Sequence, residues 1–193
     1  MKRLHPPDIL SHQLWQLHGM ETQIARELPV LAGSVLNAPL RRWLSRRAMA
    51  ARQRRDQLEN LLQHHASPVA TRTHRSIRAI LVEGNRELAR IHHPYARDVA
   101  MIEHCIRIEQ HATTSYGIAV PMTHRSGFPA ISGELNRLLE DLTNARSTFQ
   151  ALEETVFAIA ACHPHFGASA PSLPARNRKP KKTAPMPAMA VGY

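Results

Sequence analysis

Apolar residues recur at intervals of three and four along most of this chain, and that spacing predicts α-helices. Breaks in which Gly, Pro and Asn gather divide the pattern into separate helices. Long helices joined by short connections are typical of an antiparallel bundle. The predicted fold class is therefore all-α, an antiparallel four-helix bundle with one additional helix. We expect helices at residues 8–32, 39–65, 67–91, 95–120 and 130–161, with a loop at 121–129.

Two of these helices carry a glutamate at a position that the spacing assigns to the core. In the first helix, Glu21 lies between Leu17 and Ile24, and in the fourth, Glu109 follows Ile106 in a seam that steps by three and four. A carboxylate taken out of water without a partner costs several kcal/mol or becomes protonated. We therefore expect another group in the bundle to compensate Glu21 and Glu109.

The second helix offers cations for this purpose. Seven arginines fall between positions 41 and 55, and two of them, Arg47 and Arg54, lie seven residues apart on the face that should turn inward. A guanidinium group on that face could form a bidentate bond with Glu21 or Glu109. The alternative is that the faces are rotated by a third of a turn, which would place the glutamates at the edge of the bundle and the arginines in solvent.

A pair of metal ions is the other way to compensate two buried carboxylates, and it needs about six ligands from several helices. The residues three and four positions after Glu21 offer no partner, and Ala112 stands three after Glu109. A complete dimetal site cannot be assembled from this sequence. An irregular site for iron or manganese would use Glu21 and Glu109 together with His18 or His111 as extra ligands.

Composition changes this interpretation mainly at the C-terminal end. The formal net charge is +10, and half of that excess falls in residues 164–193, a segment with six of the fourteen prolines and no acidic residue. A segment of this composition buries too little apolar surface to offset the conformational entropy that it would lose on ordering. We predict a bundle domain at 1–163 and a basic, flexible tail at 164–193. The tail and the arginine-rich helix also allow a second alternative function, association with nucleic acid.

Several classes of protein are disfavoured by the rest of the sequence. The longest apolar run, 156–162, has seven residues, whereas about 20 are needed to cross a bilayer. The first residues lack the apolar segment of a secretory signal, so we expect a cytoplasmic protein without a membrane partner. The two cysteines, 57 residues apart, form no recognisable metal or redox motif, and no phosphate-binding loop or nucleophile motif occurs.

Several short segments resemble the YciE/YciF family of ferritin-like proteins, and their order and separations agree as well. The resemblance covers about residues 9–160. It implies a ferritin-like helical bundle, commonly dimeric, with a di-iron-type carboxylate centre, in bacterial proteins associated with stress responses. The segments that carry it are 20–23, 27–32, 83–87, 97–102, 108–109 and 115–117.

The same resemblance implies that most of the metal ligands are missing. Family members have a glutamate in the first helix, which Glu21 matches, and Glu109 matches another position of theirs. Where they carry a histidine and a Glu-Glu-Thr sequence in the second helix, this chain has Arg47 and residues 49–51, Met-Ala-Ala. An acidic pair in the last helix is replaced by Asn144 and Ala145.

Together these observations predict a non-catalytic structural or interaction protein with a degenerate dimetal centre and no cofactor. Arg47 and Arg54 would hold Glu21 and Glu109 in place of metal. The expected partner is a second copy of the chain or a related bundle.

Overall fold

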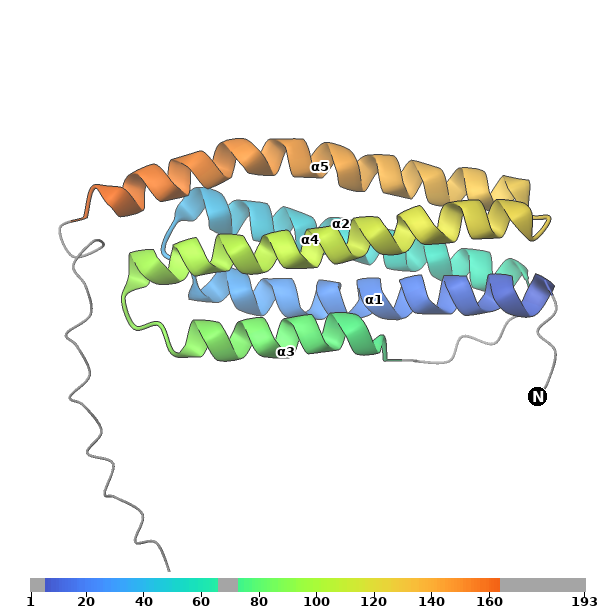
Figure 1. The fold of residues 1–193 in the computed structure, drawn as a ribbon, viewed down its shortest axis with the longest axis horizontal. Coiled ribbons are helices and arrows are strands. Elements are labelled where there is room, and N and C mark those ends of the chain that lie inside the picture. Colours follow the sequence, from blue (N-terminus) through green and yellow to red (C-terminus); the bar gives the residue numbers. More distant parts are fainter. Residues whose placement is uncertain (1–5, 66–72, 164–193) are drawn as a thin grey trace, which may run out of the picture.

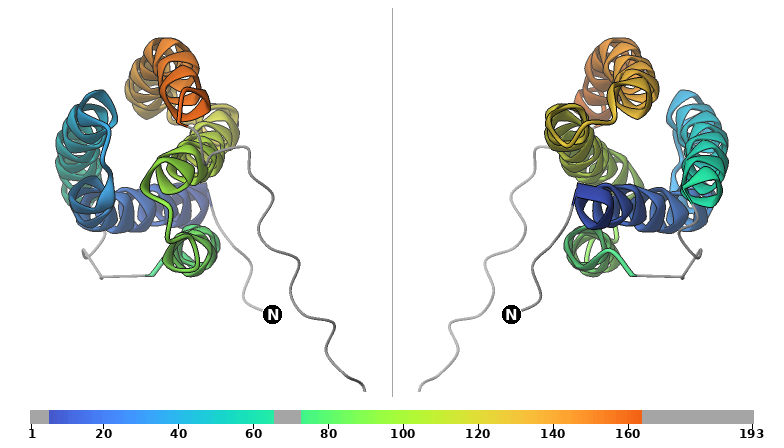
Figure 2. Two further views of the ribbon diagram at one scale, coloured as in Figure 1. Left: turned by 90° about the vertical axis from the view of Figure 1, so that its left-hand side faces the viewer. Right: turned by 90° about the vertical axis from the view of Figure 1, so that its right-hand side faces the viewer.

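A computed structural model describes residues 6–65 and 73–163. Four long helices run side by side along one axis with alternating direction, and the shorter α3 packs outside them against α1 and α4 (Figures 1 and 2). The predicted all-α bundle with an additional helix is confirmed. The helices of the described residues are α1 (Pro6–Ser34), α2 (Ala38–His64), α3 (Arg75–Ala89), α4 (Pro94–Arg125) and α5 (Pro129–Ala161).

Side chains fix where several helices begin. Those of Asn37, His74 and His93 each accept a hydrogen bond from the backbone N–H three residues on, which caps α2, α3 and α4. The buried carboxylate of Asp98 on α4 also accepts the N–H groups of Leu36 and Asn37, at 3.0 and 2.6 Å. The two Asp98 contacts tie the α1–α2 connection to the second turn of α4.

The predicted loop at 121–129 was wrong, because α4 continues through Pro121 to Arg125. Proline removes one backbone donor from a helix, yet the packing around it keeps the helix intact. Thr123 is fully buried beyond the proline, and Ser132 Oγ of α5 donates to the Val120 carbonyl at 2.8 Å. The true connection is residues 126–128, where Gly127 adopts a φ of +90° that favours glycine.

Two other predictions fall partly or wholly on residues outside the described ranges. The third helix was expected from residue 67, but α3 begins at Arg75, and residues 66–72 are not among those described. The tail at 164–193 also lies outside the described residues, so its flexibility stays a prediction.

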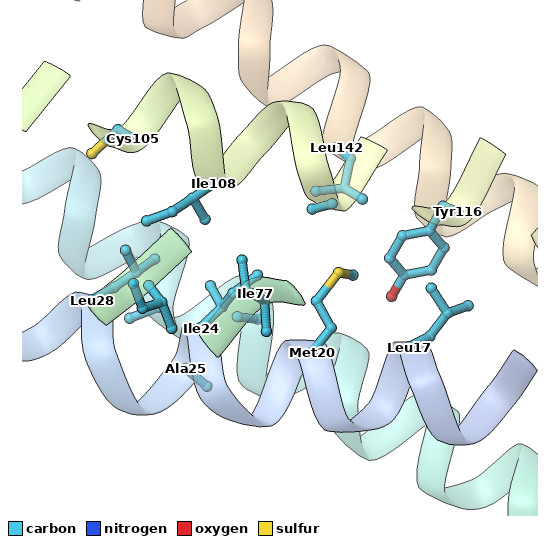
Figure 3. Packing of buried hydrophobic residues seen from close by; sticks show 14 of the residues in the cluster. Leu17, Met20, Ile24, Ala25, Leu28, Ile77, Cys105, Ile108, Tyr116 and Leu142 are labelled. Atoms are coloured by element: carbon cyan, nitrogen blue, oxygen red, sulfur yellow. The ribbon is translucent and has the colours of Figure 1, made fainter. Parts of the chain in front are cut away.

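The core follows the predicted seam of α1 closely. Every apolar member of that seam is buried, and Figure 3 shows Leu17, Met20, Ile24 and Leu28 directed from α1 toward α4. Burying such side chains in aliphatic contact is the main favourable contribution to folding. The apolar members of the α1 seam are Leu10, Leu14, Leu17, Ile24, Leu28 and Leu31.

The spacing of three and four that places Glu109 in α4 predicts one buried seam from Val99 to Val120, and this prediction is only half right. Ile102, Glu109 and Tyr116 are buried, but Val99, Ile106, Thr113 and Val120 are only half-buried. The buried arc also includes Met101, Cys105, Ile108 and Ala112. The reason is that α4 contacts α1, α3 and α5, so its buried face is wider than one seam and is shifted toward α3.

Gly84 of α3 packs directly against His104 of α4. A Cβ atom added at this position would overlap the imidazole ring of His104. The absence of a side chain at residue 84 therefore makes room for the His104 ring between the two helices.

Candidate functional site

The two seam glutamates lie at the centre of the bundle. Glu21 of α1 is fully buried, and Glu109 of α4 is 3% exposed. Each sits where the helical spacing turns a side chain inward, between apolar neighbours one turn away on either side. The fold thus encloses two carboxylates from helices that are far apart in the sequence.

Arg54 of α2 pairs with Glu21. Its Nε donates to Glu21 Oε1 at 2.8 Å, and its Nη2 donates to Oε2 at 3.4 Å. Two parallel donors facing two carboxylate oxygens form the bidentate geometry that makes Arg–carboxylate bonds strong. Arg54 is 5% exposed, so this pair is shielded from water.

Arg47, two turns earlier on α2, lies between the two carboxylates. Its Nε donates to Glu109 Oε1 at 2.5 Å, and its Nη1 is 4.0 Å from Glu21 Oε2. Arg47 is 3% exposed. Both arginines are therefore buried, and the arrangement with rotated helix faces and arginines in solvent is not the one in the structure.

Tyr116 completes this cluster, and the sequence analysis did not single it out. Its hydroxyl donates to Glu21 Oε1 at 3.2 Å, and its ring reaches from α4 toward α1 (Figure 3). The signal was present, because Tyr116 falls seven residues after Glu109 and shares its face of α4. A buried tyrosine needs a partner for its hydroxyl, and Glu21 is that partner.

Burial dominates the protonation of this cluster. It raises the pKa of Glu21 to about 7, although Arg47 and the Tyr116 hydroxyl act to lower it. Burial also raises the pKa of Glu109, against the opposing effect of Arg47. For Arg47, burial lowers the pKa, but Glu109 and Glu21 outweigh it and the pKa is raised. Arg47 therefore stays charged, whereas the carboxyl of Glu21 can take up a proton near neutral pH.

The two histidines proposed as extra ligands contact other residues. His18 Nε2 is 4.0 Å from Glu59 Oε2, and the His18 ring meets Trp15 edge-on. The ring of His111 packs against His74 with centroids 5.2 Å apart. In the part of the chain that the structure describes, no three His, Cys, Asp or Glu side chains are grouped so that they could hold a metal ion.

The remaining arginines of α2 face outward. Arg41, Arg42, Arg46 and Arg52 are exposed, and Arg55 is half-buried and bonded to Asp56 at the surface. The arginine run of the sequence is thus divided between two structural roles. Two of its members hold the interior carboxylates, and the other five form a basic outer surface.

The family described as a domain of unknown function, DUF892, matches residues 5–161. The chain belongs to this family. The fold of this chain is similar to that in the crystal structure of the E. coli stress protein YciF, with a TM-score of 0.73 over 82% of this chain and 99% of that chain. Sequence identity between the two is 18%, so the likeness concerns the fold. The predicted YciF-like assignment and ferritin-like bundle are confirmed.

No curated protein matches this DUF892 chain. None of its described helices combines the length and the apolar character that a membrane span requires.

Proposed function

We propose that this DUF892 chain is a non-catalytic structural or interaction protein in which ion pairs take the place of a dimetal centre. The observation that carries the proposal is the position of Arg47, whose guanidinium lies between Glu21 and Glu109. A fixed side-chain cation at this point compensates the buried carboxylates, which is the electrostatic task that metal ions would otherwise perform. A role in stress responses belongs to the proposal, since YciF is described as a stress protein.

The donor set supports the proposal. A dimetal centre in a helical bundle takes about six ligands from four helices. The cluster here offers two carboxylates, and each already accepts a hydrogen bond from a guanidinium group. The half-buried alanines Ala50 and Ala145 beside them carry no ligand atoms. These residues do not fit a pair of metal ions, and we derive no reaction step through one.

The alternative function is an irregular iron or manganese site that uses Glu21, Glu109 and a histidine. It would require His18 to leave Glu59, or His111 to leave His74, and to turn toward the centre of the bundle. It would also require metal to compete with Arg47 for the same carboxylate oxygens.

Elemental analysis separates these two functions. Protein from cells supplied with iron and manganese, purified without chelator, should contain well under one equivalent of metal per chain. The double variant Glu21→Gln/Glu109→Gln is the matched control and should have the same low metal content. Stoichiometric iron or manganese in the original chain that disappears in the double variant would overturn the proposal.

The interaction role includes a partner bundle, either a second copy of the chain or a related protein, and a cytoplasmic location. Support comes from Leu36 of the α1–α2 connection and Ile159 of α5, which are 51% and 40% exposed and line one pocket together. Exposed apolar side chains that gather at one place are typical of an interaction surface. Light scattering after size-exclusion chromatography should give the mass of a dimer, and Ile159→Lys should shift it toward the monomer.

The second alternative, association with nucleic acid, is favoured by the exposed arginines of α2. Phosphate contacts weaken steeply as salt rises. A mobility-shift titration with duplex DNA at two salt concentrations tests this function, and Arg42→Gln/Arg46→Gln/Arg52→Gln is the matched variant. Salt-dependent binding that the triple variant loses would favour the nucleic-acid function over the interaction role.

A further inference from the structure

A groove of about 830 Å³ opens on the side of the bundle where α2 and α5 face each other. Seen along the bundle in Figure 2, these two helices stand apart, whereas α2 lies against α1 and α5 lies against α4. The groove reaches inward to the arginines that hold the two buried glutamates. Its walls are Trp43, Arg46, Arg47, Ala50, Gln53, Arg54, Asp56 and Gln57 of α2, and Asp141, Ala145 and Thr148 of α5.

Small side chains account for the space at the middle of this groove. Ala50 and Ala145 line its two opposite walls, and both are half-buried. Trp43 lies at the edge of the same space and packs on Phe149, with ring centroids 4.2 Å apart. The groove therefore has an apolar stretch beside a charged one, which is the usual character of a small-molecule site.

Arg47 lines this wall, and its two terminal nitrogens lack hydrogen-bond partners, although Nη1 lies 4.0 Å from Glu21 Oε2. Although the residue is 3% exposed, neither Nη1 nor Nη2 has a hydrogen-bond partner, because its bond to Glu109 uses Nε. Buried guanidinium N–H groups without acceptors carry a desolvation cost that an incoming acceptor would relieve. The two terminal nitrogens form a planar edge with the spacing of a carboxylate.

We infer that the α2–α5 groove binds an organic monocarboxylate, with its carboxylate on the Nη1–Nη2 edge of Arg47 and its apolar body along Trp43, Ala50 and Ala145. The inference rests on the proposed function, since it needs Arg47 in the place where relatives would hold metal. Arg46 adds positive charge along the same wall, while Arg54 there is already paired with Glu21, and Asp56 and Asp141 add negative charge. Because little positive charge is left uncompensated, this lining disfavours a phosphate dianion more than a ligand with one negative charge.

The test uses octanoate as the probe and Trp43 as the reporter. The chain has two tryptophans, so Trp15→Phe leaves Trp43 alone to report on the groove. Octanoate should change the fluorescence of Trp43 saturably, with one site per chain and a dissociation constant below about 1 mM. Neither 1-octanol, which lacks the carboxylate, nor inorganic phosphate should reproduce this change at the same concentration.

Two variants keep the test decisive even if one of them folds poorly. Arg47→Met should weaken octanoate binding at least tenfold. Ala145→Leu fills the groove from its α5 wall while keeping Arg47, and it should weaken binding equally. Ala151→Leu, at an exposed position of the same helix, should leave binding unchanged. Equal binding by the original chain and Ala145→Leu, or equal effects of octanoate and 1-octanol, would overturn the inference.

Metal content measured on the same samples distinguishes the two ways of failing. Low metal with no octanoate binding rejects the carboxylate site and leaves the proposed function in place. Stoichiometric metal rejects both.

Discussion

Arg54 on α2 donates from its Nε to Oε1 of Glu21 on α1 across 2.8 Å, and neither side chain is more than 6% exposed. Removing one partner of such a pair leaves the other charge buried and uncompensated. At pH 8, where Glu21 is ionised, Arg54→Met should therefore lower the free energy of unfolding by about 3–5 kcal/mol, measured by urea denaturation. The double variant Glu21→Gln/Arg54→Met should recover part of the lost free energy of unfolding, because it removes the charge of Glu21 as well.

The surface pair Arg137–Glu134 provides the control for this prediction. Its nitrogen and oxygen are 2.9 Å apart, but both side chains are more than half exposed. Arg137→Met should change the free energy of unfolding by less than about 0.5 kcal/mol. An equally small effect of Arg54→Met would contradict the role given to the buried pair.

The protonation of Glu21 should make stability depend on pH in a defined direction. Burial raises its pKa in the folded chain to about 7, from an ordinary value of 4.5. Folding therefore favours the protonated acid. The contribution of Glu21 protonation to the free energy of unfolding is fully present below pH 4.5 and is lost as the pH rises through 7.

The measurement is the difference in unfolding free energy between the original chain and Glu21→Gln, which cannot titrate at this position. Between pH 5 and pH 8 the original chain should lose roughly 2 kcal/mol of unfolding free energy relative to Glu21→Gln. A constant difference over this range would show that Glu21 keeps one protonation state.

The contact between Gly84 and His104 predicts a sensitive position. A Cβ at residue 84 would overlap the His104 ring, so Gly84→Ala should destabilise the protein by about 1–3 kcal/mol, as overpacked cores do. Alanine is otherwise the better helix former. Gly133→Ala on α5, where an added Cβ meets nothing within 4 Å, should be neutral or stabilising by up to about 1 kcal/mol. Thermal unfolding of both variants checks the contrast.

Asp98 should be important for the α1–α2 connection. Its two oxygens accept the backbone N–H groups of Leu36 and Asn37, and the side chain is 2% exposed. Asp98→Ala should cost about 2–3 kcal/mol, because both donors lose a charged acceptor. Asp98→Asn keeps one acceptor oxygen and should cost less. Hydrogen exchange at the amides of Leu36 and Asn37 should speed up most in the alanine variant.

Sequence periodicity predicted the helices better than it predicted their packing. The seam of α1 placed Glu21 inside correctly, although α1 also contacts three helices and buries Trp15, Met20 and Ala25 outside that seam. The same reasoning missed the wider face of α4, which three neighbouring helices cover. The prediction ended α4 too early because it treated Pro121 as a helix break. The packing of Thr123 and the hydrogen bond of Ser132 outweigh the one backbone hydrogen bond that this proline removes.

The sequence predicted which residues form the candidate site, but it did not predict which of them bond to each other. Charged residues at core positions of three helices identified Glu21, Glu109, Arg47 and Arg54 as the residues to examine. Which guanidinium meets which carboxylate depends on the axial offset of α2 against α1 and α4, and no local pattern encodes that offset. Tyr116 was overlooked because an aromatic residue in a seam is ordinary core until its hydroxyl is seen to face Glu21.

The tight packing of α1 on α2 and of α4 on α5 makes this fold two helical hairpins laid together. The first hairpin contributes Glu21, Arg47 and Arg54 to the centre, one positive charge in excess, and the second contributes Glu109, one negative charge. With Glu21 ionised, the four charges cancel only when the two hairpins are packed together. The Arg47–Glu109 ion pair is the contact that joins the charge of one hairpin to that of the other.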